Sequence, residues 1–229
     1  MTALAVKLGW YREAALRPYV WGGAFFCFQR RMAIMRYPEI RSQILPPDAP
    51  ILARDGSKVG EVKDFWQWAY SNLIDNTARG KLAEYLIACA LDIEKTPTQP
   101  WAAFDLQSKE GIAIEVKTSG YLQTWGQNDL SKIAFGIPQT HGWDGESGKF
   151  SEEFKRQSDV YVFCVHNHKE QETINPLDTK QWDFYILQTR ILDEKVGKQR
   201  TISLSALVAL GAKKCTFESL NKEIKLLKI

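Results

Sequence analysis

The chain lacks the cysteine patterns that mark small metal or redox centres. Its four cysteines, Cys27, Cys89, Cys164 and Cys215, stand apart and form no C-x-x-C pair, so neither a zinc ribbon nor a dithiol redox site is expected. Cys89 and Cys164 lie within apolar runs, which is typical of small core residues. Unpaired, buried cysteines favour a reducing, cytoplasmic compartment.

Long apolar segments are also missing. The longest apolar run near the N-terminus covers residues 19–28, about half of the roughly 20 residues that a membrane helix needs. Glu13 and Arg17 precede it, and no small-residue cleavage site follows, so a signal peptide is not expected. We therefore expect no membrane partner.

No internal repeat and no phosphate-binding loop is present. The stretch Gly145-Glu-Ser-Gly-Lys149 falls short of the G-x-x-x-x-G-K-[ST] pattern. An ATPase that drives this protein, or a methyltransferase that works with it, would therefore be a separate chain.

What the chain does contain is typical of a folded protein. It has 229 residues, of which 45% are hydrophobic and 25% are charged, a composition suited to one large domain. A Pro-rich connector lies between Pro38 and Pro50. We expect residues 1–50 to be an N-terminal extension and linker, with 1–31 a candidate for a segment outside the fold, and residues 51–229 to form a single domain.

Net charge is a weak guide to the partner. The total is only +3, but basic residues are concentrated towards both ends of the chain and acidic residues in the middle. This distribution suits a polyanion held at the edges of a cation-binding centre. Solvated helix faces, however, would give the same segment charges.

Helical and strand patterns follow one another along the chain. Apolar spacing predicts a helix from Asp64 and a second helix over 78–91, capped at Asn76-Thr77, in which Glu84 is the only charge after Leu82. A period of two predicts paired antiparallel strands at 101–107 and 111–117. Further strands are expected at 159–165 and 182–187, helices at 190–195, at 203–210 after the cap Ser203 and at 218–228, and a mobile loop over 138–157. These elements predict an α/β fold with a central mixed sheet flanked by helices.

The predicted hairpin places three charged residues together. If its turn is centred near Glu110, Asp105 lies opposite Glu115, with Cβ atoms about 4.5–5.5 Å apart, and Lys117 projects from the same face as Glu115. Their neighbours, Phe104, Leu106, Ile112, Ile114 and Val116, point the other way and are expected to pack against a helix. One face of the hairpin is thus predicted to be core and the other charged.

Two adjacent carboxylates repel each other unless a cation neutralises them. Mg²⁺ is suitable because it binds oxygen ligands, needs only one or two carboxylates and retains water molecules. The ammonium of Lys117 can then orient the attacking water or stabilise negative charge that accumulates on a phosphate. The pattern predicts metal-assisted hydrolysis of a phosphodiester.

The same residues resemble a known family. Asp105, followed after nine residues by Glu115-Val-Lys117, is similar to the signature of the PD-(D/E)xK nuclease superfamily, which includes many restriction endonucleases. The order helix, hairpin, helix and strand is similar as well, and Ser119-Gly-Tyr121-Leu-Gln123 looks like a group of uncharacterised bacterial proteins within it. One departure is Phe104, which stands where the family often has proline. The resemblance covers residues 60–190.

The resemblance implies a restriction endonuclease-like core and Mg²⁺-dependent cleavage of DNA, with Mn²⁺ as a substitute and a role in restriction or phage defence. Asp105, Glu115, the carbonyl of Val116 and Glu84 would hold the metal, and Lys117 would serve catalysis. Auxiliary substrate contacts are implied for Arg79, Tyr121 and Gln123. A homodimer is left open.

Two alternatives stand beside this interpretation. The fold could serve a catalytically inactive module for nucleic-acid binding or assembly, and phosphodiester chemistry alone does not distinguish DNA from RNA. Glu84 has an alternative of its own as a structural partner of Arg79 or Lys117, because an isolated carboxylate in apolar surroundings needs a charged partner.

Overall fold

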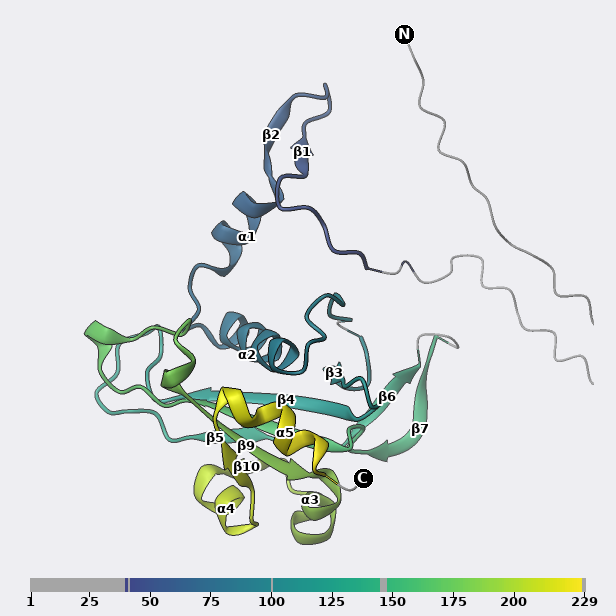
Figure 1. Ribbon diagram of the computed structural model, residues 1–229, viewed down its shortest axis with the longest axis vertical. Helices are drawn as coiled ribbons and strands as arrows, with labels where there is room; N and C mark the ends of the chain where they lie inside the picture. The colour runs from purple at the N-terminus through teal and green to yellow at the C-terminus, as the bar shows by residue number, and fades with distance from the viewer. Residues whose placement is uncertain (1–39, 41, 100, 145–147, 228–229) are drawn as a thin grey trace, which may run out of the picture. The chain divides into compact units, whose positions relative to one another are not determined.

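The computed structural model describes residues 40, 42–99, 101–144 and 148–227 (Figure 1). The chain divides between Pro38 and Glu39, and the described residues lie in the second unit. Expectations for residues 1–31, and most of those for the extension 1–50, fall outside the described residues. Within the described part of the chain, no helix has both the length and the apolar character needed to cross a membrane.

A five-stranded mixed sheet forms the centre of this unit. Its strand order is β11 (Lys213–Cys215), β9 (Trp182–Gln188), β8 (Val160–His166), β4 (Ala113–Gly120) and β3 (Leu106–Gln107). The neighbours β4 and β8 are parallel, and the other neighbouring strands are antiparallel. The strands predicted at 159–165 and 182–187 are thereby confirmed, as β8 and β9.

Helices cover both faces of the sheet. One core joins the sheet to α2 (Asn76–Ala90) and α5 (Leu220–Lys225). The second core, on the other face, includes residues of α3 (Thr189–Val196), α4 (Leu204–Ala209) and the strand pair β5 (Ala134–Gly136) and β10 (Thr201–Ser203). Figure 1 shows α2 on one side of the sheet and α3 and α4 on the other. The expected α/β class is confirmed.

Burial on both faces explains the sequence of β8. All seven of its residues are buried. Val162 and Cys164 belong to the first core, whereas Tyr161 and Phe163 belong to the second. A strand covered on both sides is apolar throughout and does not alternate with polar residues.

Helix starts follow local hydrogen bonding. Ser203 caps α4 as predicted, because its Oγ accepts the N–H of Ala206 at 3.2 Å. The predicted cap of α2 at Asn76-Thr77 is wrong by one residue. The cap is Asp75, whose Oδ1 accepts the N–H of Thr77 at 2.9 Å.

A small hairpin precedes the sheet. It pairs β1 (Pro50–Leu52) with β2 (Lys58–Glu61) and leads into the predicted first helix, α1 (Val62–Tyr70). No residue of α1 is buried. The described residues also include 3₁₀ turns at Gln171–Thr173, Thr179–Gln181 and Phe217–Ser219.

The region predicted as a mobile loop, 138–157, is instead largely a β-hairpin. It pairs β6 (Thr140–Asp144) with β7 (Lys149–Lys155). Aromatic side chains opposite one another across the two strands stabilise such a pair, and the glycines of this stretch concealed the strand pattern. In the described part of 121–159, strands β5, β6 and β7 stand where the family resemblance implies a helix.

Candidate active site

The predicted hairpin register is observed. Leu106 pairs with Ile114, and Gln107 pairs with Ala113. The turn closes where Gly111, at φ +88°, donates its N–H to the Ser108 carbonyl at 3.0 Å. Regular pairing ends at Leu106, so the predicted pair of Asp105 with Glu115 is not part of the ladder.

Asp105 lies just outside the regular strand. Its N–H donates to the carbonyl of Ile114 at 3.1 Å, and its Oδ2 accepts the N–H of Val116 at 2.7 Å. The side chain thus takes the position of a backbone acceptor, a local competition that ends regular pairing. The strand predicted over 101–107 is wrong for 101–105, and only Leu106–Gln107 is a strand.

Glu115 and Lys117 share one face of β4, as predicted. Lys117 Nζ lies 2.5 Å from Glu115 Oε1, and the side chains are 29% and 19% exposed respectively. Both groups are therefore partly shielded but remain in reach of solvent. Their residual exposure separates them from the fully buried side chains of the adjoining strand.

The expectation that this face is purely charged is wrong. In the parallel pairing of β4 and β8, Glu115 lies next to Tyr161 and Lys117 next to Phe163. The two aromatic residues are 3% and 0% exposed and belong to the second core. Both faces of β4 therefore carry core, and the charged pair emerges from an aromatic surface.

This surface changes the protonation of Glu115. Burial raises the pKa of the Glu115 carboxyl, and the negative charge of Asp105 raises it further, whereas Lys117 acts in the opposite direction. The pKa of Tyr161 is also raised, first by burial and then by the charge of Glu115. Asp105 and Glu115 therefore repel each other in a site of reduced solvation.

Glu84 brings a third carboxylate towards the hairpin from α2. Its side chain is 12% exposed and pairs with Lys81 Nζ at 2.7 Å. Burial raises the pKa of Glu84, and Asp105 raises it as well, while Lys81 and Lys117 lower it. The charged partner expected for Glu84 is thus Lys81, one helical turn earlier, and not Arg79.

A cavity borders the carboxylate of Asp105. Asp105 and Phe104 line a cavity of about 360 Å³ together with residues from the segment 93–99. Phe104 was expected to join the core, but it borders this cavity instead. Leu106 packs against the first core as predicted, with Ile112, Ile114 and Val116.

The donor set fits Mg²⁺ better than a metal that needs several side-chain ligands. Among the described residues, no three His, Cys, Asp or Glu side chains form a group that could hold a metal ion. Asp105, Glu115 and Glu84 are each engaged by a donor: Val116 N–H, Lys117 and Lys81 respectively. Mg²⁺ needs only one or two carboxylates and takes water for its other ligands. Asp105 and Glu115, with their mutual repulsion, meet that requirement.

The predicted auxiliary residues Arg79 and Gln123 lie together at the other end of β4. Arg79 is 3% exposed and donates through Nη1 to the Ile74 carbonyl at 3.0 Å and to Gln123 Oε1 at 3.5 Å. Gln123 Nε2 donates to the Gly120 carbonyl at 2.9 Å. Gly120 lies three positions after Lys117, about 10 Å along the strand, so this network is distinct from the carboxylates.

Tyr121, the third auxiliary residue, is half-buried and packs against the second core. Its ring lies 4.6 Å from Lys169 Nζ. The structure therefore places Tyr121 with the second core and not beside Asp105.

Sequence reasoning missed two features of the site: the pairing of Lys81 with Glu84 and the position of Tyr161. Lys81 stands three positions before Glu84, a spacing that signals a helical ion pair. Tyr161 left no such signal, because its position beside Glu115 depends on which strands pair.

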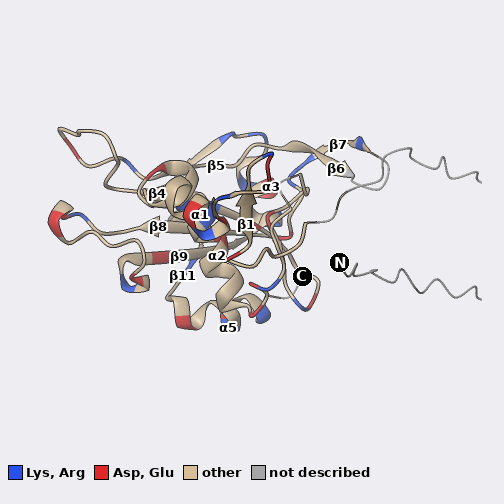
Figure 2. Cartoon of the chain, turned by 90° about the horizontal axis from the view of Figure 1, so that it is seen from above, with Lys and Arg blue, Asp and Glu red and all other residues tan. Residues whose placement is uncertain are grey.

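Basic side chains do not form one continuous face. Residues of both signs are spread over the described chain (Figure 2). Lysines near the C-terminus are paired with acids: Lys214 with Asp183 at 2.9 Å and Lys225 with Glu110 at 3.3 Å.

No protein-family model matches the chain. No curated protein matches its sequence either.

Proposed function

We propose that this protein is a metal-dependent DNA endonuclease with a restriction endonuclease-like core. One observation carries the proposal: Asp105 Oδ2 accepts the N–H of Val116, the residue after Glu115, at 2.7 Å, and Lys117 pairs with Glu115 at 2.5 Å. Glu84 faces the same carboxylates from α2. This is the constellation on which the resemblance to PD-(D/E)xK nucleases rests.

Electrostatics supports a functional origin for the cluster. Keeping repelling carboxylates in a partly desolvated place costs folding free energy. Burial and the Asp105 charge together raise the pKa of Glu115. A cation bound between the carboxylates would relieve the repulsion. A metal-binding role therefore explains why the two carboxylates lie close together.

Asp105, Glu115, the main-chain carbonyl of Val116 and Glu84 are the residues that would hold the metal. When bound, Mg²⁺ or Mn²⁺ supplies charge neutralisation at the phosphate and lowers the pKa of a water molecule. Lys117, which pairs with Glu115, orients the attacking water and stabilises charge on the phosphate oxygens. Tyr161 and Phe163 exclude water from one side of this pair.

The second candidate is a non-catalytic nucleic-acid-binding or assembly module. It is favoured by the hydrogen bond from Val116 N–H to Asp105 Oδ2, because a purely structural hairpin would make that contact too. The two candidates differ in whether a divalent cation binds and whether phosphodiester bonds break.

Cleavage tests the first candidate directly. Purified protein is incubated with circular and with linear DNA, with Mg²⁺ or with EDTA, and an RNA of the same sequence is included. We expect circles to be opened only with Mg²⁺, and the Lys117→Ala variant to be inactive. Unchanged circles with the wild-type protein, or full activity of Lys117→Ala, would contradict the proposal.

Metal binding separates the two candidates even without activity. Isothermal titration with Mn²⁺ is expected to show a site in the wild-type protein that is lost in Asp105→Asn. Asp55→Asn is the matched control, because Asp55 is an exposed carboxylate whose partner is Ser57. Equal Mn²⁺ binding by wild type and Asp105→Asn would favour the non-catalytic module.

A further inference from the structure

The hairpin β6–β7 carries an aromatic face. His141 pairs with Phe154, and Trp143 with Phe150, and the ring centroids are 4.9 and 5.0 Å apart. Phe150 is 63% exposed and Phe154 is 55% exposed. Large aromatic side chains this exposed on a short hairpin are typical of a binding surface.

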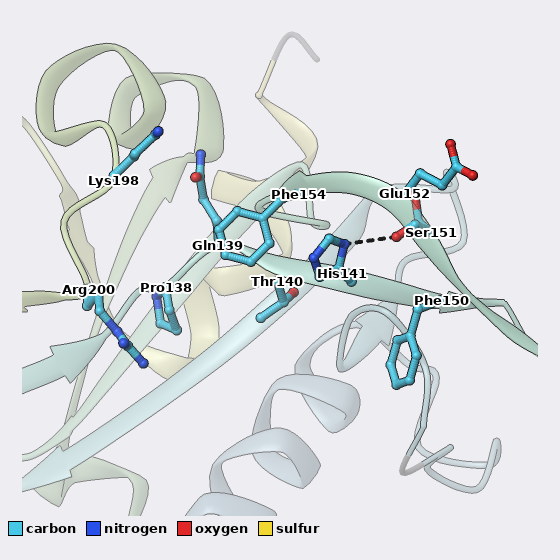
Figure 3. A pocket seen from close by; sticks show the side chains of 10 residues that line it. All are labelled: Pro138, Gln139, Thr140, His141, Phe150, Ser151, Glu152, Phe154, Lys198 and Arg200. Carbon is cyan, nitrogen blue, oxygen red and sulfur yellow. Dashed lines mark hydrogen bonds between the residues drawn. The ribbon is translucent and has the colours of Figure 1, made fainter.

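This face borders a pocket of about 820 Å³. Phe154, His141 and Phe150 line it from the hairpin, and Lys198 and Arg200 line it from the segment between α3 and β10 (Figure 3). The pocket thus combines aromatic rings with two cations.

The two cations are available to a ligand. Among the described residues, neither Lys198 nor Arg200 is in an ion pair within 4.0 Å of an acid, in contrast to Lys155, which pairs with Glu153. Glu152 is the acid that lines the pocket, and Figure 3 shows it at the opposite end from Lys198 and Arg200. A ligand with a flat apolar part and a negative charge is complementary to this arrangement.

The hairpin lies against the segment that carries Asp105. A Cβ built on Gly142 of β6 would lie 3.5 Å from Ala103 Cβ and 2.8 Å from Gln157 Oε1. Ala103 is two residues before Asp105. Gln157 holds the hairpin in place by donating to the Thr140 carbonyl at 2.8 Å. The hairpin that carries the aromatic face therefore contacts the segment of Asp105, through the face of β6 opposite His141 and Trp143.

We propose that this pocket binds an unpaired nucleotide of a single-stranded stretch of DNA whose backbone continues to Asp105 and Glu115. The base stacks on Phe154, and the phosphate contacts Lys198 and Arg200. The inference rests on the proposed nuclease function and names its substrate as DNA with an unpaired segment. Stacking on a side chain needs an open base face, which a duplex covers with neighbouring bases.

The aromatic half is tested by binding in EDTA, where no cleavage occurs. Fluorescence anisotropy with a short labelled single strand is expected to show about five- to hundredfold weaker binding for Phe154→Ala, and near wild-type binding for Phe154→Trp. Trp68→Ala is the matched control, because Trp68 is 85% exposed on α1, away from the pocket residues. Equal binding by wild type and Phe154→Ala would overturn the inference.

The cationic half is tested by salt dependence. Each lost phosphate contact on a single strand lowers the slope of log binding constant against log salt by about 0.7. We expect Lys198→Ala with Arg200→Ala to lower the slope by about 1.4, and Lys195→Ala, an exposed cation of α3, to leave it unchanged. An unchanged slope in the double variant would contradict the pocket even if Phe154→Ala were to unfold.

A blunt duplex of the same sequence is the remaining comparison. We expect it to bind more weakly than the single strand, and its binding to be insensitive to Phe154→Ala. Equal affinity and equal loss for both DNA forms would overturn the assignment to an unpaired nucleotide. Binding that depends on Phe154 but occurs without cleavage would contradict the nuclease function and support the nucleotide pocket. Cleavage that Lys117→Ala abolishes, together with DNA binding that Phe154→Ala leaves unchanged, would support the nuclease function and contradict the nucleotide pocket.

Discussion

The two ends of strand β4 hold polar groups in opposite ways. In its first half, Glu115 and Lys117 are paired with each other and partly exposed, and Asp105, which is bonded to Val116, lines a cavity. At its end, Gly120 lies beside Arg79 and His166, which are 3% and 2% exposed. A Cβ on Gly120 would lie 3.1 Å from Arg79 Nη1, so the guanidinium packs directly on the strand.

The buried end serves the fold. Burial lowers the pKa of the Arg79 guanidinium, and it lowers the pKa of His166 to about 4, with the positive charge of Arg79 adding to the effect. Arg79 Nε, Thr118 Oγ1 and His166 Nε2 are buried without a hydrogen-bond partner among the described residues. Such groups are costly, and the bonds of Arg79 to Ile74 and Gln123 offset part of that cost.

This difference shows how polar side chains that stabilise the fold can be distinguished from polar side chains of the candidate active site. Arg79 and Gln123 join segments that are distant in sequence, and neither lines the cavities described above. Asp105, Glu115 and Lys117 are close in sequence, repel or pair among themselves, and remain reachable. Substitutions at the two ends should therefore affect different measurements.

The largest effect is expected from Asp105→Asn. The amide oxygen can still accept the Val116 N–H, so the free energy of unfolding should change by less than about 1 kcal/mol. Loss of the charge should lower Mg²⁺-dependent cleavage about a thousandfold or more, roughly 4 kcal/mol in transition-state stabilisation. Steady-state cleavage and urea denaturation measure the two quantities. Cleavage at the wild-type rate by this variant would contradict the functional role of Asp105.

Arg79→Ala should have the opposite profile. It leaves the Ile74 carbonyl and Gln123 without their donor and opens a cavity, so we expect a loss of about 3 kcal/mol in the free energy of unfolding. Urea denaturation gives the value. Lys81→Ala, an exposed cation on the same helix, should cost less than about 1 kcal/mol, and a similar loss in both variants would refute the structural role of Arg79.

His166 should make stability depend on pH. Unfolded histidine binds a proton below about 6.5, whereas folded His166 does so only below about 4. Its contribution is therefore present above pH 6.5 and lost as the pH falls towards 4, at most about 3 kcal/mol. Thermal denaturation at pH 7, 5.5 and 4 should show a shallower loss for His166→Gln than for wild type.

Glu84→Gln should give the smallest change. Burial raises the pKa of Glu84, so neutralising it should raise the free energy of unfolding by up to about 1 kcal/mol, after loss of the Lys81 pair. Cleavage should fall about tenfold if Glu84 only assists the metal. A loss of stability with unchanged cleavage would show that Glu84, like Arg79, stabilises the fold and does not serve cleavage.

Local patterns were sufficient for part of the fold and of the candidate site. The turn at Gly111 and the alternation around it predicted the register of Leu106 with Ile114, and with it the closeness of Asp105 to Val116, because both strands and their turn lie within one short segment. Ser203 as a helix cap depends on hydrogen bonds within one turn of the chain. Such features need no knowledge of distant segments.

Other predictions were wrong or incomplete because they depended on contacts between residues that are distant in the sequence. The stretch 138–157 contains glycines typical of a loop, yet pairing of Trp143 with Phe150 makes it a hairpin. The face of Glu115 was expected to be charged, but parallel pairing with β8 brings the aromatic ring of Tyr161 beside it. The Arg79 network depends on a contact with Gln123, 44 positions away.

The sequence by itself determined which charges meet on the β3–β4 hairpin, because backbone geometry alternates side chains between faces and a short turn fixes the register. Only the tertiary structure decided what surrounds those charges: the approach of Glu84 on α2, the aromatic neighbours on β8 and the hairpin beside Asp105. Those contacts depend on how separate elements pack over both faces of the sheet, and packing is a property of the whole fold and not of any local pattern.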